Sequence, residues 1–404
     1  MKLFLAENRN IRLFYVLAVA NGVSFIMGNW IFFWLRYMTW GQLSLVDGLA
    51  FAFGLLMEIP TGAVADLVGK KKTLMAAMLL STLGALAMSF SGSAIAIFGF
   101  FLIWQVGMAL YSGAVEAFAY DTLIDIGEER HFDQVIATQS MLAIITSVVT
   151  VLVGMWLYSL HFRLSHIAWG LAYLVGFIAT IFLSEPNVET EKFSWYGYFI
   201  QLRDGTKHLF QPALRRFLPL IFTLTGVYFF YFYGFIRPAI AISFDFNHET
   251  QSVIFAVISV VAGVIIRVIP WLRTRVSDMR GLLFLATLLG GGFLAAAFPI
   301  GHYGFWAMFA IGIAGRLTLP WVSIVVNKHL ESKYRATALS VIALVTRIPY
   351  AIIAITAGQL VEQGHLPAFN SAVAIIVFAI LVISMAYGYF CRLWTGRDRI
   401  KGVE

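Results

Sequence analysis

Acidic side chains inside long apolar segments are the groups with the clearest capacity for chemistry. Glu58 lies in an apolar segment at 43–65, and Glu116 lies near the end of another at 94–119. A carboxyl group in hydrocarbon holds its proton more tightly than in water, which suits it to proton transport. We therefore expect Glu58 and Glu116 to be proton-coupling residues, unless fixed cations neutralise them for packing alone.

Four arginines also fall within apolar segments. Arg316 and Arg347 are nearest the middle of their segments, where a guanidinium group can hold an anion through two parallel hydrogen bonds. Two interpretations stay open for this pair: binding of an anionic substrate, or permanent neutralisation of the intramembrane acids. Arg237 and Arg267 lie closer to segment ends, so we expect their long side chains to reach the membrane surface.

These side chains must be positioned by segments that cross a bilayer. The chain has 404 residues, of which 60% are hydrophobic and 12% charged, whereas soluble domains are about 25% charged. A spanning helix needs about 20 apolar residues. Segments of about this length predict an all-α membrane protein with twelve transmembrane helices, at 11–35, 43–65, 73–90, 94–119, 134–160, 167–183, 213–242, 252–272, 282–300, 303–327, 336–361 and 369–393.

Lysine and arginine lie almost entirely on one side of these segments. Of the 28 such residues, 22 fall in loops or tails on one side, two on the other and four inside segments. Basic loops stay in the cytoplasm. We therefore expect a multi-pass protein of the bacterial inner (plasma) membrane with both termini cytoplasmic. The net charge of +7 follows from this topology, and we expect no nucleic-acid partner.

A polar stretch divides the segments six and six. This division predicts an N-terminal six-helix bundle at 1–183, a cytoplasmic linker at 184–212 and a C-terminal six-helix bundle at 213–404. Transporters made of two related halves bind their substrate near the middle of the membrane, where the halves meet, and rock around that site.

The end of the second segment carries small, acidic and basic residues at fixed spacing: Gly62, Asp66, Gly69, Lys70 and Lys71. This pattern resembles the cytoplasmic signature of the major facilitator superfamily, although Leu67 stands where the family usually has a basic residue. The longer run at 58–66, Glu-Ile-Pro-Thr-Gly-Ala-Val-Ala-Asp, resembles a subgroup of bacterial permeases, many of them described as exporters. Residues 116–123 and 335–340 are similar to the same subgroup.

The resemblance implies a conformational latch on the cytoplasmic side. In the family, such contacts hold the two halves in the outward-facing state, and here Asp66 would face the positive end of the helix near Arg335. The implied latch residues are Gly62, Asp66, Gly69, Lys70, Lys71, Asp121 and Arg335. Lys70 or Lys71 is a candidate to replace the basic residue missing at Leu67. Alternatively, the lysines only set the topology.

The resemblance also points to a central cavity. In the family, the first, fourth, seventh and tenth helices line it. The polar residues of these segments are therefore substrate-binding candidates together with Arg316 and Arg347: Asn21, Asn29, Gln105, Tyr228 and Tyr231.

Several kinds of site are missing from the sequence. It has no Walker-type phosphate loop, no cluster with metal-ligand spacing and no nucleophile motif, so we expect no cofactor, no metal and no enzymatic activity. The segment at 134–160 has Gly154 as its only glycine and lacks the Gly-Pro-Gly-Gly pattern of many drug antiporters of the family.

These observations favour a proton-coupled secondary transporter that works by alternating access and exports a small amphiphilic or anionic compound. Its expected partners are that small molecule, protons and the lipid bilayer, and we expect a monomer. The alternatives are a proton-coupled nutrient uptake symporter and a non-transporting membrane receptor or assembly factor on a transporter fold. A membrane enzyme lacks support because no catalytic constellation is present.

Overall fold

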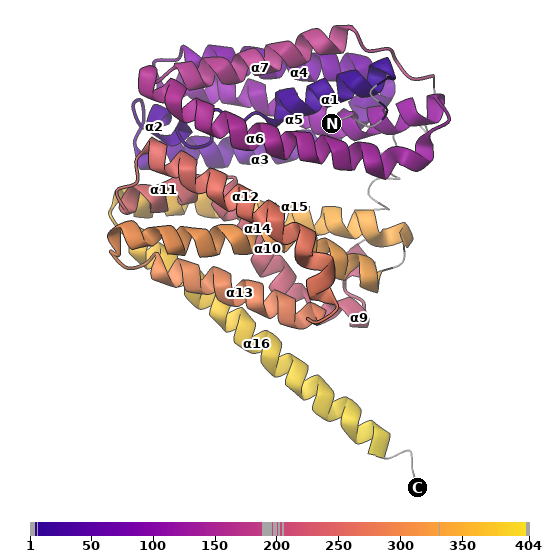
Figure 1. Cartoon of the computed structure of the whole chain (residues 1–404). Coiled ribbons are helices and arrows are strands. Elements are labelled where there is room, and N and C mark those ends of the chain that lie inside the picture. Colours follow the sequence, from indigo (N-terminus) through magenta and orange to yellow (C-terminus); the bar gives the residue numbers. More distant parts are fainter. Residues whose placement is uncertain are drawn as a thin grey trace. The chain divides into compact units, whose positions relative to one another are not determined.

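The computed structural model describes residues 5, 7–187, 196, 200, 203, 206–330 and 332–400, without the side chains of 58–66, 270, 273, 332–337, 340 and 388–400. Its secondary structure over these residues is helical (Figure 1). The elements from the first half of the sequence are α1 (Arg9–Gly22), α2 (Trp30–Trp34), α3 (Trp40–Val68), α4 (Lys70–Ser89), α5 (Ala94–Asp125), η1 (Glu129–His131), α6 (Phe132–Leu160) and α7 (Leu164–Ile181). The elements from the second half are α9 (Pro212–Arg215), α10 (Leu218–Phe232), α11 (Ile236–Ser243), α12 (His248–Arg273), α13 (Asp278–Ala295), η2 (Gly301–Tyr303), α14 (Gly304–His329), α15 (Ser332–Glu362) and α16 (Leu366–Ile400).

The chain forms two compact units. The first contains Met1–Gly197 together with Asn247–Ser259, and the second contains Tyr198–Phe246 together with Val260–Glu404. The helix α12 therefore begins in the first unit and continues into the second. The domain boundaries proposed from the sequence stay a prediction.

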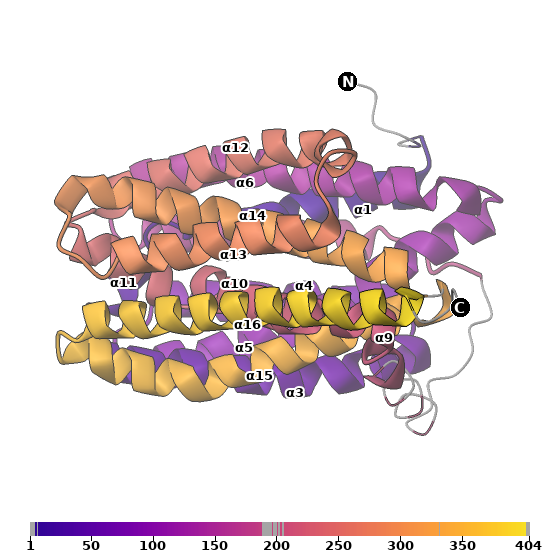
Figure 2. The same ribbon diagram turned by 90° about the horizontal axis from the view of Figure 1, so that it is seen from below.

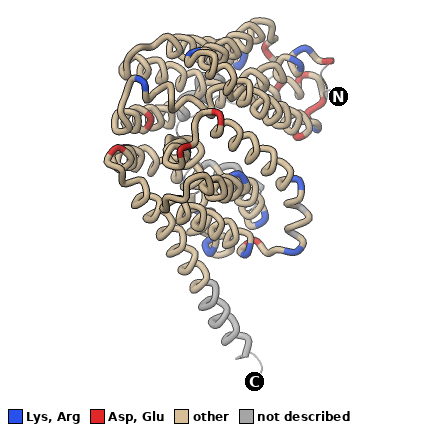
Figure 3. Tube along the Cα trace, turned by 60° about the vertical axis from the view of Figure 1, so that its left-hand side comes forward, with Lys and Arg blue, Asp and Glu red and all other residues tan. Residues whose placement is uncertain are grey.

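The helices are long and apolar enough for a bilayer. Within the described residues, ten of them qualify as membrane spans, and the bent pair α10–α11 makes an eleventh candidate. Figure 3 shows the reason: charged residues gather near helix ends, with long uncharged stretches between them. We call the end of the helices where most lysines and arginines lie the basic end.

Two predicted helices are interrupted, so a count of twelve spans stays a prediction. The segment at 11–35 forms α1 and α2, separated by residues 23–29, and α1 alone has only 14 residues. At 1.5 Å per residue, α1 is about 21 Å long, short of the roughly 30 Å of hydrocarbon. The apolar composition predicted correctly that this segment belongs to a membrane protein, but the prediction that it forms one continuous helix was wrong.

The segment at 213–242 is divided into α9, α10 and α11, with a bend of 67° between the last two. Pro238 lies in the first turn of α11. A proline ring clashes with the carbonyl group four residues earlier, which here belongs to Gly234, inside the break. Pro320 and Pro349, by contrast, lie within the continuous helices α14 and α15.

The same packing order occurs in both halves of the sequence. In the first half, α4 packs against α5 and α7, and α1 packs against α6. In the second half, α13 packs against α14 and α16, and α10 packs against α15. Figure 2 shows the helices of the second unit from below, with α16 nearest the viewer. The interrupted first helix of each half thus packs against the fifth helix of that half.

Candidate functional site

A buried ion pair joins two helices at the basic end of the first unit. The Nζ atom of Lys70, the first residue of α4, contacts the Oδ2 atom of Asp121 near the end of α5. Both residues are buried, each with 6% of its surface exposed. Of the two lysines proposed to replace the missing basic residue at Leu67, Lys70 is the one that meets Asp121.

A carboxylate from the start of the linker caps the same helix. The backbone N–H groups of Lys70 and Lys71 donate to the two carboxylate oxygens of Glu185, over 2.6 and 2.9 Å. The preceding residue, Gly69, has a φ of +100°, which favours glycine. Negative charge is stabilised at a helix N-terminus. Sequence reasoning missed Glu185, although an acid just after the sixth segment was visible.

Three of the proposed latch residues belong to stretches whose side chains lie outside the described structure. For Gly62 and Asp66 on α3 and for Arg335 on α15, the structure describes the backbone alone. The same holds for the proton-coupling candidate Glu58. Their backbones are helical, and their roles stay predictions.

The second unit has an ion pair at the corresponding place with the charges exchanged. Asp278 begins α13, and its Oδ2 atom accepts from Lys328 Nζ near the end of α14 over 2.8 Å. Trp321 Nε1 also donates to the backbone carbonyl of Asp278. The Lys328 side chain is 60% exposed while that of Asp278 is 8% exposed, so only the acid is buried.

Polar side chains of α6 hold the break between α1 and α2. The backbone N–H of Ser24 donates to Thr150 Oγ1, and the hydroxyl groups of Ser24 and Ser147 are hydrogen-bonded, both over 2.7 Å. A side chain at Gly154 would collide with the backbone carbonyl of Phe25. Backbone groups freed inside a membrane need such partners. The sequence carried this signal as two small hydroxyl residues and a glycine at positions 147, 150 and 154, on one helical face.

Two asparagines near this break differ in their surroundings. Asn29 is fully buried and donates to the carbonyl groups of Phe25 and Gly154, and it accepts from the hydroxyl of Ser165. These contacts indicate that Asn29 supports the break. Asn21, in the last turn of α1, has a buried Oδ1 atom without a hydrogen-bond partner among the described residues. Of the two asparagines, Asn21 therefore has the better geometry for a ligand contact.

Arginine and aromatic side chains gather where α10 packs with α14 and α15. The guanidinium carbon of Arg316 lies 5.1 Å from the Phe232 ring centre, and that of Arg347 lies 4.7 Å from the Phe229 ring centre. Tyr228 packs against both rings, at 5.0 and 5.2 Å, and is within electrostatic reach of both guanidinium groups. We call Tyr228, Phe229, Phe232, Arg316 and Arg347 the arginine–aromatic cluster. Sequence reasoning selected three of its five members.

A third arginine extends the positive charge of this region. Arg237 is 8% exposed, so the expectation that it reaches the membrane surface is wrong. It lies on α11, within electrostatic range of Arg316. Arg267 is exposed on α12, and its reach to the membrane surface stays a prediction.

The remaining candidates lie elsewhere. Tyr231 is fully buried, and its hydroxyl approaches the carbonyl oxygen of Met308 at 3.5 Å, so it packs in the core of the second unit. Gln105 donates to the carbonyl of Ala50 and joins α5 to α3. Glu116 is exposed on α5.

The two halves carry opposite charges at membrane depth. The spans of the first half contain acids such as Asp47, Glu58 and Glu116, whereas those of the second half contain arginines. The acids of the second half that the structure describes lie between helices or near helix ends: Asp245, Glu249, Asp278, Glu362 and Asp398. Within the described residues, no group of three or more potential metal ligands occurs. The spans of the second half therefore carry positively charged side chains, and those of the first half carry negatively charged ones.

The family follows from a comparison with known protein families. A model of the Major Facilitator Superfamily matches residues 13–354. The chain belongs to the Major Facilitator Superfamily. It is thus a multi-pass membrane protein of a transporter family rather than an enzyme. A comparison with curated proteins found no match.

Solved structures of Major Facilitator Superfamily transporters have a similar fold. The nucleoside transporter NupG is 17% identical with a TM-score of 0.71, covering 95% of this chain and 99% of its own. A POT family transporter in complex with 5-aminolevulinic acid is 13% identical with a TM-score of 0.72, covering 95% and 97%. A D-xylose–proton symporter is 11% identical with a TM-score of 0.67, covering 94% and 96%. At these identities the likeness concerns the fold alone.

Proposed function

We propose that this protein is a proton-coupled secondary transporter that exports a small organic anion by alternating access. The observation that carries the proposal is the arginine–aromatic cluster of the second unit. Arg316 and Arg347 lie on two helices that both pack against α10, each over an aromatic ring. A carboxylate or phosphate group suits such a pair because guanidinium groups bind it through two hydrogen bonds.

The charge of the second half supports an anionic substrate. Cations at membrane depth are costly, and the spans of this half contain four arginines. The arriving anion would reduce the repulsion between Arg237 and Arg316. The aromatic rings beside the guanidinium groups favour an amphiphilic anion, because they offer apolar surface next to charge.

The first half is the proposed source of proton coupling. Glu58 and Glu116 lie on α3 and α5, and each is a carboxyl group on a membrane span. One of them would take up a proton on the side where the anion leaves and release it on the cytoplasmic side when the next anion binds, so that protons flow inward as anions flow outward. Export, rather than uptake, rests on the resemblance of 58–66 to a subgroup of exporters.

The basic end is the proposed cytoplasmic side of a bacterial inner membrane. There, the pair Lys70–Asp121 and the cap by Glu185 fix the beginning of α4, next to Asp66. This arrangement supports a latch between Asp66 and the helix that carries Arg335. We further propose twelve spans in two six-helix bundles and a monomer.

The test is anion-driven proton movement in inverted vesicles that contain the purified protein. A panel of aromatic carboxylates, dicarboxylates, phosphate esters and matched neutral amides is added under an imposed pH gradient. We expect proton movement with an anion and not with its amide. The Arg316→Gln and Arg347→Gln variants should lower it by about tenfold or more, because a hydrogen bond to a charged group contributes about 1.5–3 kcal/mol.

Arg267→Gln is the matched control, since it removes the same charge from an exposed position on a membrane helix. It should transport like the wild type. Equal losses in all three variants would contradict the proposed site. Accumulation in right-side-out vesicles would indicate uptake, and no flux with any compound would favour the non-transporting alternative.

A further inference from the structure

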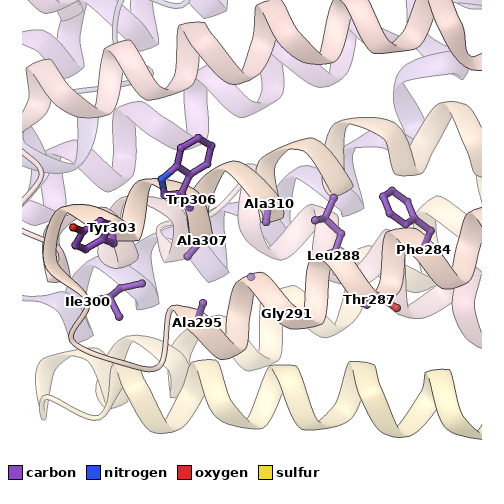
Figure 4. A pocket seen from close by; sticks show the side chains of 11 residues that line it. Phe284, Thr287, Leu288, Gly291, Ala295, Ile300, Tyr303, Trp306, Ala307 and Ala310 are labelled. Carbon is purple, nitrogen blue, oxygen red and sulfur yellow. The ribbon is translucent and has the colours of Figure 1, made fainter.

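A groove on the second unit lies between α13 and α14. It has a volume of about 340 Å³ and is lined by residues from α13, η2 and the start of α14. Figure 4 shows Ile300, Tyr303 and Trp306 toward the η2 end of the groove and Phe284 and Thr287 toward the other end. Both helices are long and apolar enough to span a membrane, so the groove runs along the depth of the bilayer.

The lining leaves no place for a polar ligand along most of the groove. Its middle consists of small and apolar residues: Leu288, Gly291, Gly292, Ala295, Ala307 and Ala310. The hydroxyl of Thr287 donates to the carbonyl of Leu283 over 2.9 Å, within its own helix. An occupant that needed hydrogen bonds would lose them here, so the occupant must be apolar.

One end of the groove is different. Tyr303 and Trp306 are 77% and 65% exposed, and they carry a hydroxyl and an indole N–H. These residues lie next to the loop at the end opposite the basic end. Tyrosine and tryptophan are enriched at the level of lipid headgroups, where one side of the ring is apolar and the other polar. The groove is therefore apolar along its length and polar at its mouth.

We infer that this groove binds one acyl chain of a membrane phospholipid, with the ester region beside Tyr303 and Trp306. The volume agrees with this occupant. A methylene group is close in size to a water molecule, which takes about 30 Å³ of liquid, so the groove holds on the order of ten methylene groups. The inference does not depend on the transported substrate.

Gly291 provides the means to close the groove. It is exposed, and a Cβ atom placed there would meet nothing within 4 Å. A larger side chain therefore enters the groove without disturbing the helix packing. Gly99 on α5 is the matched control, because it is also an exposed helical glycine with open space around its Cβ position.

The experiment uses the full chain in vesicles containing a phospholipid with a photoreactive diazirine in its acyl chain. After illumination, the adducts are mapped by peptide mass spectrometry. In the wild type we expect adducts concentrated at residues 284–310. Gly291→Leu should lower their yield by about tenfold, the loss expected when about two buried methylene groups lose contact. Gly291→Ala should give an intermediate yield, and Gly99→Leu should leave the yield unchanged.

Two outcomes would overturn the inference. One is an even distribution of adducts over all lipid-facing helices, unchanged in Gly291→Leu, which would mean that no lipid is held in the groove. The other is an absence of adducts at 284–310 together with a dimer in native mass spectrometry that Gly291→Leu disrupts. That result would assign the groove to a second copy of the chain. Thermal unfolding midpoints of the three variants that equal the midpoint of the wild type verify that the variants are folded.

Discussion

The first helix of each half is interrupted, and the two interruptions are held by different chemistry. Between α1 and α2, backbone and side-chain polar groups of Ser24 are bonded to Ser147 and Thr150 of α6. Between α10 and α11, Gly234 packs under the ring of Tyr350 on α15, with Phe230 against the same ring. One break is held by hydrogen bonds and the other by aromatic packing.

The ion pairs of the basic end differ in a similar way. Lys70–Asp121 is buried at both partners, whereas Lys328–Asp278 has an exposed lysine. Interrupted first helices in corresponding positions are a feature of transporters that bind substrate at the interruption. The two halves therefore differ in two respects. In the first half, hydrogen bonds hold the break and the spans carry acids; in the second half, aromatic packing holds the break and the spans carry arginines.

The largest effect should follow from breaking the buried ion pair. Asp121→Asn leaves the buried Lys70 ammonium without its counter-ion and should lower the free energy of unfolding by about 3–5 kcal/mol. Thermal unfolding in detergent measures this. The double variant Lys70→Met with Asp121→Leu should recover most of the loss, because an apolar pair of similar volume replaces the charges. A single variant as stable as the wild type would contradict the buried pair.

The next largest loss of stability should come from adding a methyl group at the glycine of each break. Gly154→Ala places a Cβ atom against the backbone carbonyl of Phe25 and should cost about 3 kcal/mol, near the upper end of the range for overpacking. Gly234→Ala meets the side chain of Tyr350, which can move, and should cost about 1 kcal/mol. Unfolding midpoints of both variants test the order, and a larger loss in Gly234→Ala would reverse the comparison.

A smaller effect should come from the hydroxyl that receives the Ser24 N–H. Thr150→Val keeps the shape and removes the acceptor, so it should cost about 1–2 kcal/mol. Thr346→Val on α15 is the control, since the hydroxyl of Thr346 donates to carbonyl groups of its own helix. Equal stability losses in the two variants would mean that the break does not depend on α6.

The smallest effect should be at the second ion pair. Asp278→Asn should cost less than about 1 kcal/mol, because the Lys328 ammonium is exposed and water replaces its partner. Increasing salt should reduce the difference from the wild type, whereas the effect of Asp121→Asn should persist. A salt-independent loss of several kcal/mol in Asp278→Asn would contradict the difference between the pairs.

Much of this organisation was predictable from composition. Long apolar segments predicted the helical membrane fold, and the spacing of Gly62, Asp66 and Gly69 predicted the family that the comparison established. The breaks were not predictable from hydropathy. An apolar composition indicates that a segment lies in the membrane, but it does not determine whether the backbone of that segment is one continuous helix. Pro238 indicated the second break by its missing N–H and its ring. The first depends on Thr150 and Gly154, more than a hundred residues away.

The candidate site was predictable in part, for a similar reason. Arg316 and Arg347 were visible as charges in apolar surroundings. Their aromatic neighbours were hidden among 36 phenylalanines, because composition cannot show which of them face a guanidinium group. Asn29 shows the same difficulty: a polar residue in a membrane segment can bind a ligand or satisfy the backbone, and its contacts with Phe25, Gly154 and Ser165 are visible only in the structure.

The central claim, that the arginines of the second half bind an anion, is tested most directly by equilibrium binding. The anion that drives the largest flux is titrated calorimetrically into the wild type, Arg316→Gln and Arg267→Gln in detergent. The account predicts a Kd raised about tenfold or more in Arg316→Gln, equivalent to at least about 1.4 kcal/mol, and unchanged in Arg267→Gln. An unchanged Kd in Arg316→Gln, or the same loss in both variants, would contradict it.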